Sequence, residues 1–217
     1  MNRQQKKAAA QKVVALLATR YPQIQTHLRH TNAWELLAAT MLAAQCTDER
    51  VNTVTPALFT RWPGPEAMAG ADIAEVEHIV RPTGFYRNKA KNLVAAAEKI
   101  MREFDGEVPH DMKGLTSLPG VARKTANVVL FGAFGINEGI AVDTHVGRIA
   151  WRIGLTSTRD PVKAEQELMK LVPKKEWGDF NHRLVWFGRH VCQARKPLCP
   201  ECEMAFFCEK QALASVL

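Results

Sequence analysis

Apolar residues recur at helical spacing along nearly the whole chain, and no segment alternates in the way that is typical of a β-strand. One stripe in the segment 88–104 consists of Leu93, Ala97, Ile100, Met101 and Phe104. The segments 160–172 and 179–192 show the same spacing, and prolines and glycines separate the helical segments. The sequence therefore predicts an all-α fold with about ten helices.

Two segments are apolar on nearly all sides of a helix. They are 36–44, which only Thr40 interrupts, and 126–134. A helix of this kind belongs inside a core, so we expect both helices to be buried. The polar run Gln45 to Asp48 ends the first segment, and we expect it at the surface or at the mouth of a pocket. Plain capping is the alternative, with Asp48 as the N-cap of a helix over 49–60.

The basic residues of the chain are unevenly distributed. The 217 residues carry a formal net charge of +7, and residues 1–20 contain no acidic residue. A second basic excess, set against Glu98 alone, consists of Arg81, Arg87, Lys89, Lys91, Lys99 and Arg102. Such patches suit a polyanion such as nucleic acid, and a solvated helix face explains them equally well.

Composition excludes several protein classes. With 47% hydrophobic and 24% charged residues, the chain is neither disordered, collagen-like nor a disulfide-rich miniprotein. No apolar run reaches the roughly 18 residues of a membrane helix, and no secretion signal is visible. We therefore expect a cytoplasmic protein without a membrane partner, whose cysteines bind a metal or stay as free thiols.

The segment 115–126, LTSLPGVARKTA, predicts two helices joined by a Pro-Gly turn. Gly120 adopts positive φ at no steric cost, and the amides at the start of the second helix lie at the positive end of its dipole. This helix-hairpin-helix pattern favours a nucleic-acid phosphate as the ligand, and an ordinary αα-hairpin turn is the alternative. Lys124 falls in the first turn, where the dipole and partial burial disfavour an ammonium group. A nucleophilic and a phosphate-binding lysine are equally open there.

Asp143 stands at the start of a further predicted helix, which runs to about Arg152. Capping and the helix dipole both favour its carboxylate form. From this segment alone, a cap without a chemical role is the favoured interpretation.

Four cysteines lie close together near the C-terminus, spaced C-x6-C-x2-C-x5-C: Cys192, Cys199, Cys202 and Cys208. Four thiolates suit structural zinc or an iron–sulfur cluster, and the spacing alone does not choose between them. Two disulfides are the alternative, which the absent secretion signal disfavours. Between the first two cysteines, a loop would present Arg195 and Lys196 to a phosphate backbone.

Together these patterns resemble the endonuclease III family, the helix-hairpin-helix DNA glycosylases of base excision repair. The resemblance also includes the runs LAAQCTD at 42–48 and GFYRNKA at 84–90, and VDTH at 142–145. It implies an all-α, two-domain helix-hairpin-helix glycosylase fold. Residues 26–137 would form a six-helix barrel domain that contains the hairpin, and residues 1–25 with 138–217 a cluster domain that holds a structural [4Fe–4S] cluster on the four cysteines.

The same resemblance implies a bifunctional DNA glycosylase and AP lyase that removes oxidised pyrimidines. Lys124 would form a Schiff base that leads to β-elimination, with Asp143 as the catalytic carboxylate. The partner would be double-stranded DNA with damaged bases or abasic sites, bound by a monomer that is nucleoid-associated if bacterial. Gln45 and Phe85 would fill the gap left by the extruded base. The other implied DNA contacts are Gly120, Ala122, Arg123, Thr125, His145, Arg148, Arg195 and Lys196.

The sequence departs from the family pattern at Ala122, where glycine is usual, and the extra methyl group puts DNA affinity in question. Two other functions stay open. An adenine-specific mismatch glycosylase normally lacks the lysine and has a further C-terminal domain, whereas Lys124 is present and nine residues follow Cys208. A non-catalytic or weakly active DNA-binding paralogue would have no use for Lys124 together with Asp143.

Overall fold

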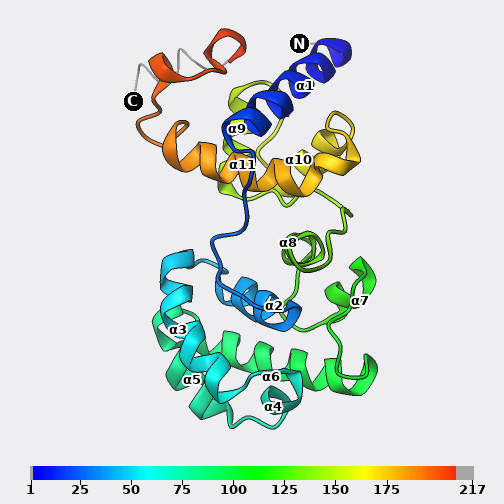
Figure 1. The fold of residues 1–217 in the computed structure, drawn as a ribbon, viewed down its shortest axis with the longest axis vertical. Helices are drawn as coiled ribbons and strands as arrows, with labels where there is room; N and C mark the ends of the chain where they lie inside the picture. Colours follow the sequence, from blue (N-terminus) through cyan, green and yellow to red (C-terminus); the bar gives the residue numbers. More distant parts are fainter. Residues whose placement is uncertain (1, 209–217) are drawn as a thin grey trace. The chain divides into compact units, whose positions relative to one another are not determined.

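A computed structural model describes residues 2–208, which form eleven α-helices and four short 3-10 helices and no strand (Figure 1). The α-helices are α1 (Arg3–Arg20), α2 (Ala33–Leu42), α3 (Asp48–Arg61), α4 (Pro65–Ala69), α5 (Ile73–Val80), α6 (Tyr86–Glu103), α7 (Met112–Ser117), α8 (Arg123–Phe134), α9 (Thr144–Arg152), α10 (Pro161–Met169) and α11 (Trp177–His190). The 3-10 helices are η1 (Arg81–Thr83), η2 (Lys174–Glu176), η3 (Cys199–Glu201) and η4 (Ala205–Phe207). The all-α prediction is confirmed. Within the described residues, no helix has both the length and the apolar character of a membrane span.

The chain divides into two compact units, each with its own apolar core. The middle unit comprises residues 26–138 and contains α2 to α8. The terminal unit combines residues 1–25 with 139–217 and contains α1 and α9 to α11. Of the expected cluster domain, residues 209–217 lie outside the described residues. Since each unit encloses a separate cluster of buried side chains, each has the core that a domain needs.

The two all-apolar segments form α2 and α8, which pack against each other in the middle unit. The prediction of burial holds for the part of 36–44 that lies in α2, whose buried residues are Trp34, Leu36, Leu37, Ala38, Ala39, Met41 and Leu42. It is wrong for Ala44, which follows the helix and is exposed. It is also wrong for the last turn of α8, where Phe134 is 36% exposed. The helix α8 is buried only in its middle, at Ala126, Asn127, Val129 and Leu130, while α2 and α7 pack against it.

The predicted start of α3 is wrong by one residue, and the predicted apolar stripe of α6 is only partly buried. Thr47, not Asp48, is the N-cap of α3, and its hydroxyl oxygen accepts from the amide of Arg50 at 3.2 Å. A threonine hydroxyl can accept the capping hydrogen bond as an aspartate carboxylate can. Because the cap is Thr47, the helix begins at Asp48, one residue earlier than predicted. On α6 the predicted stripe is buried except at its C-terminal end, where Met101 is 38% exposed.

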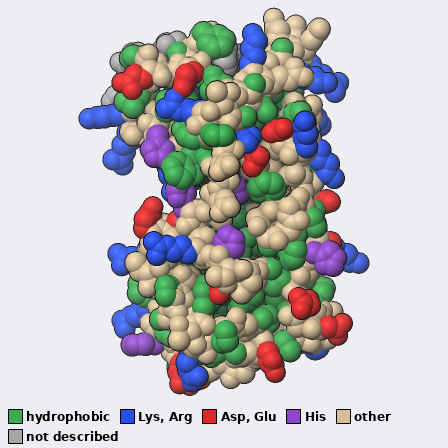
Figure 2. Space-filling view, viewed as in Figure 1, with side chains coloured by type: hydrophobic (Ala, Val, Ile, Leu, Met, Phe, Trp, Pro, Cys, Tyr) green, Lys and Arg blue, Asp and Glu red, His purple; other side chains and the backbone are tan. Residues whose placement is uncertain are grey.

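The terminal unit is organised around α11, which packs against α1 and α9. Within this unit, Arg183 of α11 donates from Nε to the carbonyl of Tyr21 at 3.1 Å, and its guanidinium also pairs with Asp179 at 3.0 Å. These contacts fasten the end of α1 to a helix more than 160 residues later in the chain. On the face drawn in Figure 2, basic and acidic side chains are interspersed, so net charge by itself does not mark a binding surface.

Candidate functional site

The predicted hairpin is present in the middle unit as α7, a turn and α8. The amides of Leu118 and Val121 close the turn by donating to the carbonyls of Leu115 and Leu118, both at 3.1 Å. Gly120 has φ +77°, and a Cβ at this position would lie 2.8–3.0 Å from three side-chain atoms of Asn92. The turn therefore needs glycine for its backbone conformation and also for space.

Helix α8 has Ala122 as its N-cap residue and no side-chain cap. Ala122 is exposed, with φ −88° and ψ 165°, an extended conformation that any residue adopts. Alanine in place of the usual glycine therefore causes no backbone strain. Since the N-cap residue has no side-chain acceptor, this helix start suits an external anion at its positive end.

Lys124 lies in the first turn of α8 and is exposed. The expectation of partial burial is not met, since the buried face of the helix begins two residues later at Ala126. Its neighbour Arg123 is exposed and donates to the carbonyl of Glu138 at 3.3 Å, while Thr125 is half-buried. The amine of Lys124 is therefore accessible to a large substrate.

Asp143 is the N-cap of α9 in the terminal unit, as predicted, and α9 ends at Arg152. Its Oδ1 accepts hydrogen bonds from the amides of His145 at 2.9 Å and Val146 at 2.8 Å. Both cap bonds use the same carboxylate oxygen. Capping and any chemical role can therefore be divided between Oδ1 and Oδ2.

Two side chains on α9 surround this cap. Burial lowers the pKa of His145, which the nearby Asp143 opposes and the charge of Arg148 reinforces. The guanidinium of Arg148 lies 3.2 Å from His145 Nδ1 and donates to the carbonyl of Cys192 at 2.9 Å. Arg148 is thus half-buried and engaged with backbone, and its contact with DNA stays a prediction.

A second arginine of α9 holds the loop between the first two cysteines. Arg152 donates to the carbonyls of Gln193 and Ala194, each at 2.8 Å. The next two residues of the loop, Arg195 and Lys196, are exposed. The loop is therefore fixed at its base and presents both cations to solvent, as the sequence predicted.

Gln45 and Phe85 occupy two loops of the middle unit and share an unusual backbone conformation. Their φ angles are +54° and +47°, in the left-handed region that disfavours residues with a side chain. Gln45 is exposed, and the Phe85 ring is 64% exposed, a large unburied apolar surface. An exposed aromatic side chain on a strained loop points to a binding role.

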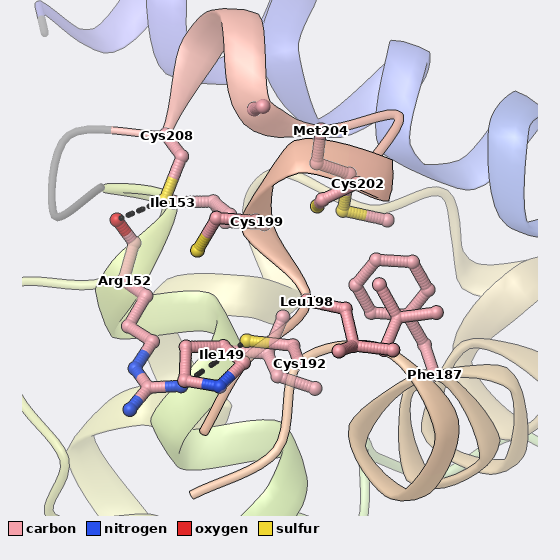
Figure 3. A pocket seen from close by; sticks show the side chains of 13 residues that line it. Ile149, Arg152, Ile153, Phe187, Cys192, Leu198, Cys199, Cys202, Met204 and Cys208 are labelled. Carbon is pink, nitrogen blue, oxygen red and sulfur yellow. Dashed lines mark hydrogen bonds between the residues drawn. The ribbon is translucent and has the colours of Figure 1, made fainter. Parts of the chain in front are cut away.

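The four cysteines line one pocket of the terminal unit (Figure 3). Its walls are otherwise mostly apolar and include Ile149, Ile153, Phe187, Val191 and Met204. Burial raises the pKa of Cys202 to about 11, and the three other cysteine thiols add to the rise. Within residues 2–208, no group of three or more His, Cys, Asp or Glu side chains is arranged to hold a single metal ion.

Lys89 does not belong to the basic surface patch in which its sequence position had placed it. The structure buries Lys89, and only 7% of the residue is exposed. A signal was available, because Lys89 precedes Leu93 by four residues and Ala97 by eight, which places it on the apolar stripe of the helix. The roles of Arg152 and Asn92 were also missed, and no local pattern indicates them.

Comparison with protein families gives the class of the molecule. The family described as "HhH-GPD superfamily base excision DNA repair protein" matches residues 38–174, a range that includes the hairpin, Lys124 and Asp143. The match covers more than half of the chain. The fold and the site therefore define a helix-hairpin-helix protein of the base excision repair superfamily.

Similar proteins narrow this class. Endonuclease III of Synechocystis sp. is 53% identical over 203 residues, which cover 94% of this chain and 93% of that protein. A solved non-covalent endonuclease III–DNA complex is 39% identical, has a TM-score of 0.91 and covers 97% of this chain and 99% of its own. A trapped covalent endonuclease III–DNA intermediate is 40% identical and has the same TM-score of 0.91. The match covers 96% of this chain and 98% of that chain. The chain belongs to the endonuclease III family.

Proposed function

We propose that this chain is a bifunctional DNA glycosylase and AP lyase that removes oxidised pyrimidines from duplex DNA, with Lys124 as its nucleophile. The observation that carries the proposal is the exposed Lys124 in the first turn of α8, directly after the Gly120 turn. The trapped covalent complex of a similar endonuclease III supports it, because a covalent intermediate requires a nucleophile on the protein.

In the proposed reaction, the neutral amine of Lys124 attacks C1′ of the damaged nucleotide. A bond forms between Nζ and C1′, and the glycosidic bond breaks with its electron pair leaving on the base, which takes up a proton. That proton comes from the attacking nitrogen. The C1′–O4′ bond then breaks with its electron pair on O4′, which takes up a proton, and the nitrogen lone pair forms the C1′=N bond of a protonated Schiff base. That imine acidifies C2′, and removal of the C2′ proton expels the 3′ phosphate and cuts the strand.

Asp143 would be the catalytic carboxylate. It can accept a proton on the way to the neutral amine, and its negative charge stabilises positive charge that develops on the sugar. Because both cap bonds go to Oδ1, we assign the proton transfer to Oδ2. The cap bonds then hold the carboxylate in one orientation through the reaction.

DNA binding would combine phosphate contacts with two side chains that enter the base stack. The amides at the start of α8, together with Arg123, Thr125, Arg195 and Lys196, would contact phosphates, which position the duplex without reading its sequence. Gln45 and Phe85 would occupy the space left by the extruded base. Extrusion costs a few kcal/mol, and least at a damaged pair, which favours lesions over intact bases. With this substrate, a monomer associated with the nucleoid is expected.

The four cysteines would hold a [4Fe–4S] cluster. The donor set fits, since four thiols line one pocket, and burial together with the three neighbouring thiols raises the pKa of Cys202, which a bound cation would offset. The cluster would act structurally, by linking the loop that carries Arg195 and Lys196 to the end of the described chain. No step of the base-removal chemistry depends on it.

The test is a duplex oligonucleotide with one oxidised pyrimidine, incubated with the protein in the presence of borohydride. Wild-type protein is expected to cut the strand and to give a covalent adduct by reduction of the imine. Lys124→Gln is expected to abolish both while it retains binding to damaged DNA. Lys163→Gln, which removes another exposed lysine on α10, is the control and should behave as wild type. Adducts that persist in Lys124→Gln would move the nucleophile to another amine.

A further inference from the structure

Lys89 is a buried lysine on α6 whose ammonium group connects two distant parts of the middle unit. Its Nζ donates to the carbonyl of Leu42 at 2.8 Å and to the carbonyl of Thr83 at 2.7 Å. Burial lowers the pKa of Lys89, which the nearby Cys46 opposes. Burial by itself therefore disfavours a charged side chain here, and simple packing would be better served by an apolar residue.

The two carbonyls belong to helix ends that lead directly to Gln45 and Phe85. Leu42 is the last residue of α2, and Gln45 is the third residue after it. Thr83 is the last residue of η1, and Phe85 is the second residue after it. The final carbonyls of a helix lack partners inside the helix, and a cation suits the negative end of its dipole. Lys89 therefore closes both helix ends with one group.

The backbone at the two loop positions needs such external support. Outside glycine, only Gln45, Phe85 and Asp105 have positive φ in the part of the chain that the structure describes. Strained conformations of this kind persist where the surroundings fix them. Lys89 also donates from its own backbone amide to the carbonyl of Phe85 at 3.1 Å. It thus contacts the Phe85 loop through both its main chain and its side chain.

We propose that Lys89 is a positioning residue that fixes the Gln45 and Phe85 loops relative to each other, so that both side chains enter the DNA stack as one rigid pair during base extrusion. The inference rests on the proposed function, because it requires that Gln45 and Phe85 fill the gap in the duplex. Lys89 itself touches neither the DNA nor the reacting sugar. It acts through the two loops. Because they are already ordered before DNA binds, the entropy cost of ordering them does not arise during base extrusion.

The experiment compares Lys89→Met, which keeps an unbranched side chain one heavy atom shorter and removes its donors, with wild type on two substrates. The first is a duplex with the oxidised pyrimidine opposite 2-aminopurine, whose fluorescence reports loss of stacking around the lesion. The second is an abasic site in a single-stranded oligonucleotide, where no base pair has to be opened. We expect Lys89→Met to slow extrusion and excision on the duplex by about tenfold or more, and cleavage of the single strand by less than about threefold.

Two controls separate positioning from general destabilisation. Ile100→Ala removes a fully buried side chain near the other end of the same helix, so it destabilises α6 without touching the two carbonyls. At a temperature where both variants are folded, it should leave the ratio of the two rates near that of wild type. In a Gln45→Ala, Phe85→Ala background, Lys89→Met should add little further loss, because nothing is left for it to position.

The results that would contradict the role of Lys89 differ from those that would contradict the proposed function. Equal extrusion by Lys89→Met and wild type, equal losses on both substrates, or fully additive losses in the triple variant would each overturn the role of Lys89. Wild-type protein that cleaves neither substrate would instead overturn the proposed function, and this proposal with it. If Lys89→Met does not fold, Lys89→Arg gives the same comparison, because its planar fork keeps the charge but does not reproduce both bonds.

Discussion

Replacement of Gly120 by alanine tests the physical account of the hairpin turn. At φ +77°, an alanine costs about 1–2 kcal/mol in conformational energy. The new methyl group would also meet Asn92 Nδ2 at 2.8 Å, Cβ at 2.9 Å and Cγ at 3.0 Å. Overpacking of this kind costs about 1–3 kcal/mol. The expected decrease in the free energy of unfolding is therefore about 2–5 kcal/mol.

Gly135 provides a matched control at the other end of α8. It has φ +68°, and a Cβ there would meet nothing within 4 Å. Gly135→Ala should therefore show the conformational cost alone, about 1–2 kcal/mol. Adding Asn92→Ala to Gly120→Ala removes Nδ2 and Cγ but keeps Cβ, so it should restore only part of the loss.

Urea unfolding followed by circular dichroism measures the free energy of unfolding of all four proteins. The hairpin should also lose affinity for undamaged duplex in Gly120→Ala, because displacement of the turn moves the amides at the start of α8. If Gly120→Ala loses no more stability than Gly135→Ala, the steric part of the reasoning is wrong. If it loses stability and binds DNA as wild type does, the turn is structural only.

Three further outcomes are expected. Asp143→Asn keeps the cap and removes the charge, so single-turnover base excision should fall by about 10²–10⁴-fold with little change in thermal stability; full excision activity would leave Asp143 as a cap alone. Arg195→Ala with Lys196→Ala should weaken damaged and undamaged DNA alike and reduce the salt slope of binding by about one to two; an unchanged slope would show that the loop does not contact phosphate. Purified protein should contain about four irons per chain, and Cys199→Ser should lose iron and stability before it loses chemistry; one zinc and no iron by elemental analysis would contradict the cluster.

Interactions between near neighbours in the chain were predictable from the sequence. The helical stripes follow from residue spacing, the cap at Asp143 from a carboxylate three residues before the amide of Val146, and the hairpin from glycine beside proline. Each depends on groups within one or two turns of helix, so neighbouring residues suffice to specify them. The errors at Asp48 and Phe134 lie at helix ends, where packing decides between adjacent positions.

Contacts between distant segments were decided only by the tertiary structure. The side chain of Lys89 reaches a carbonyl 47 residues earlier, and Arg152 reaches Ala194, 42 residues later. The positive φ angles of Gln45 and Phe85 are also set by the tertiary structure, since neither residue type favours that conformation on its own. The sequence determined which helices form, and it alone led to the side chains that we propose for the chemistry. Their exposure, partners and strain depend on the packing of segments that lie far apart in the chain, because a buried charge or a strained loop is stable only when that packing supplies its hydrogen bonds.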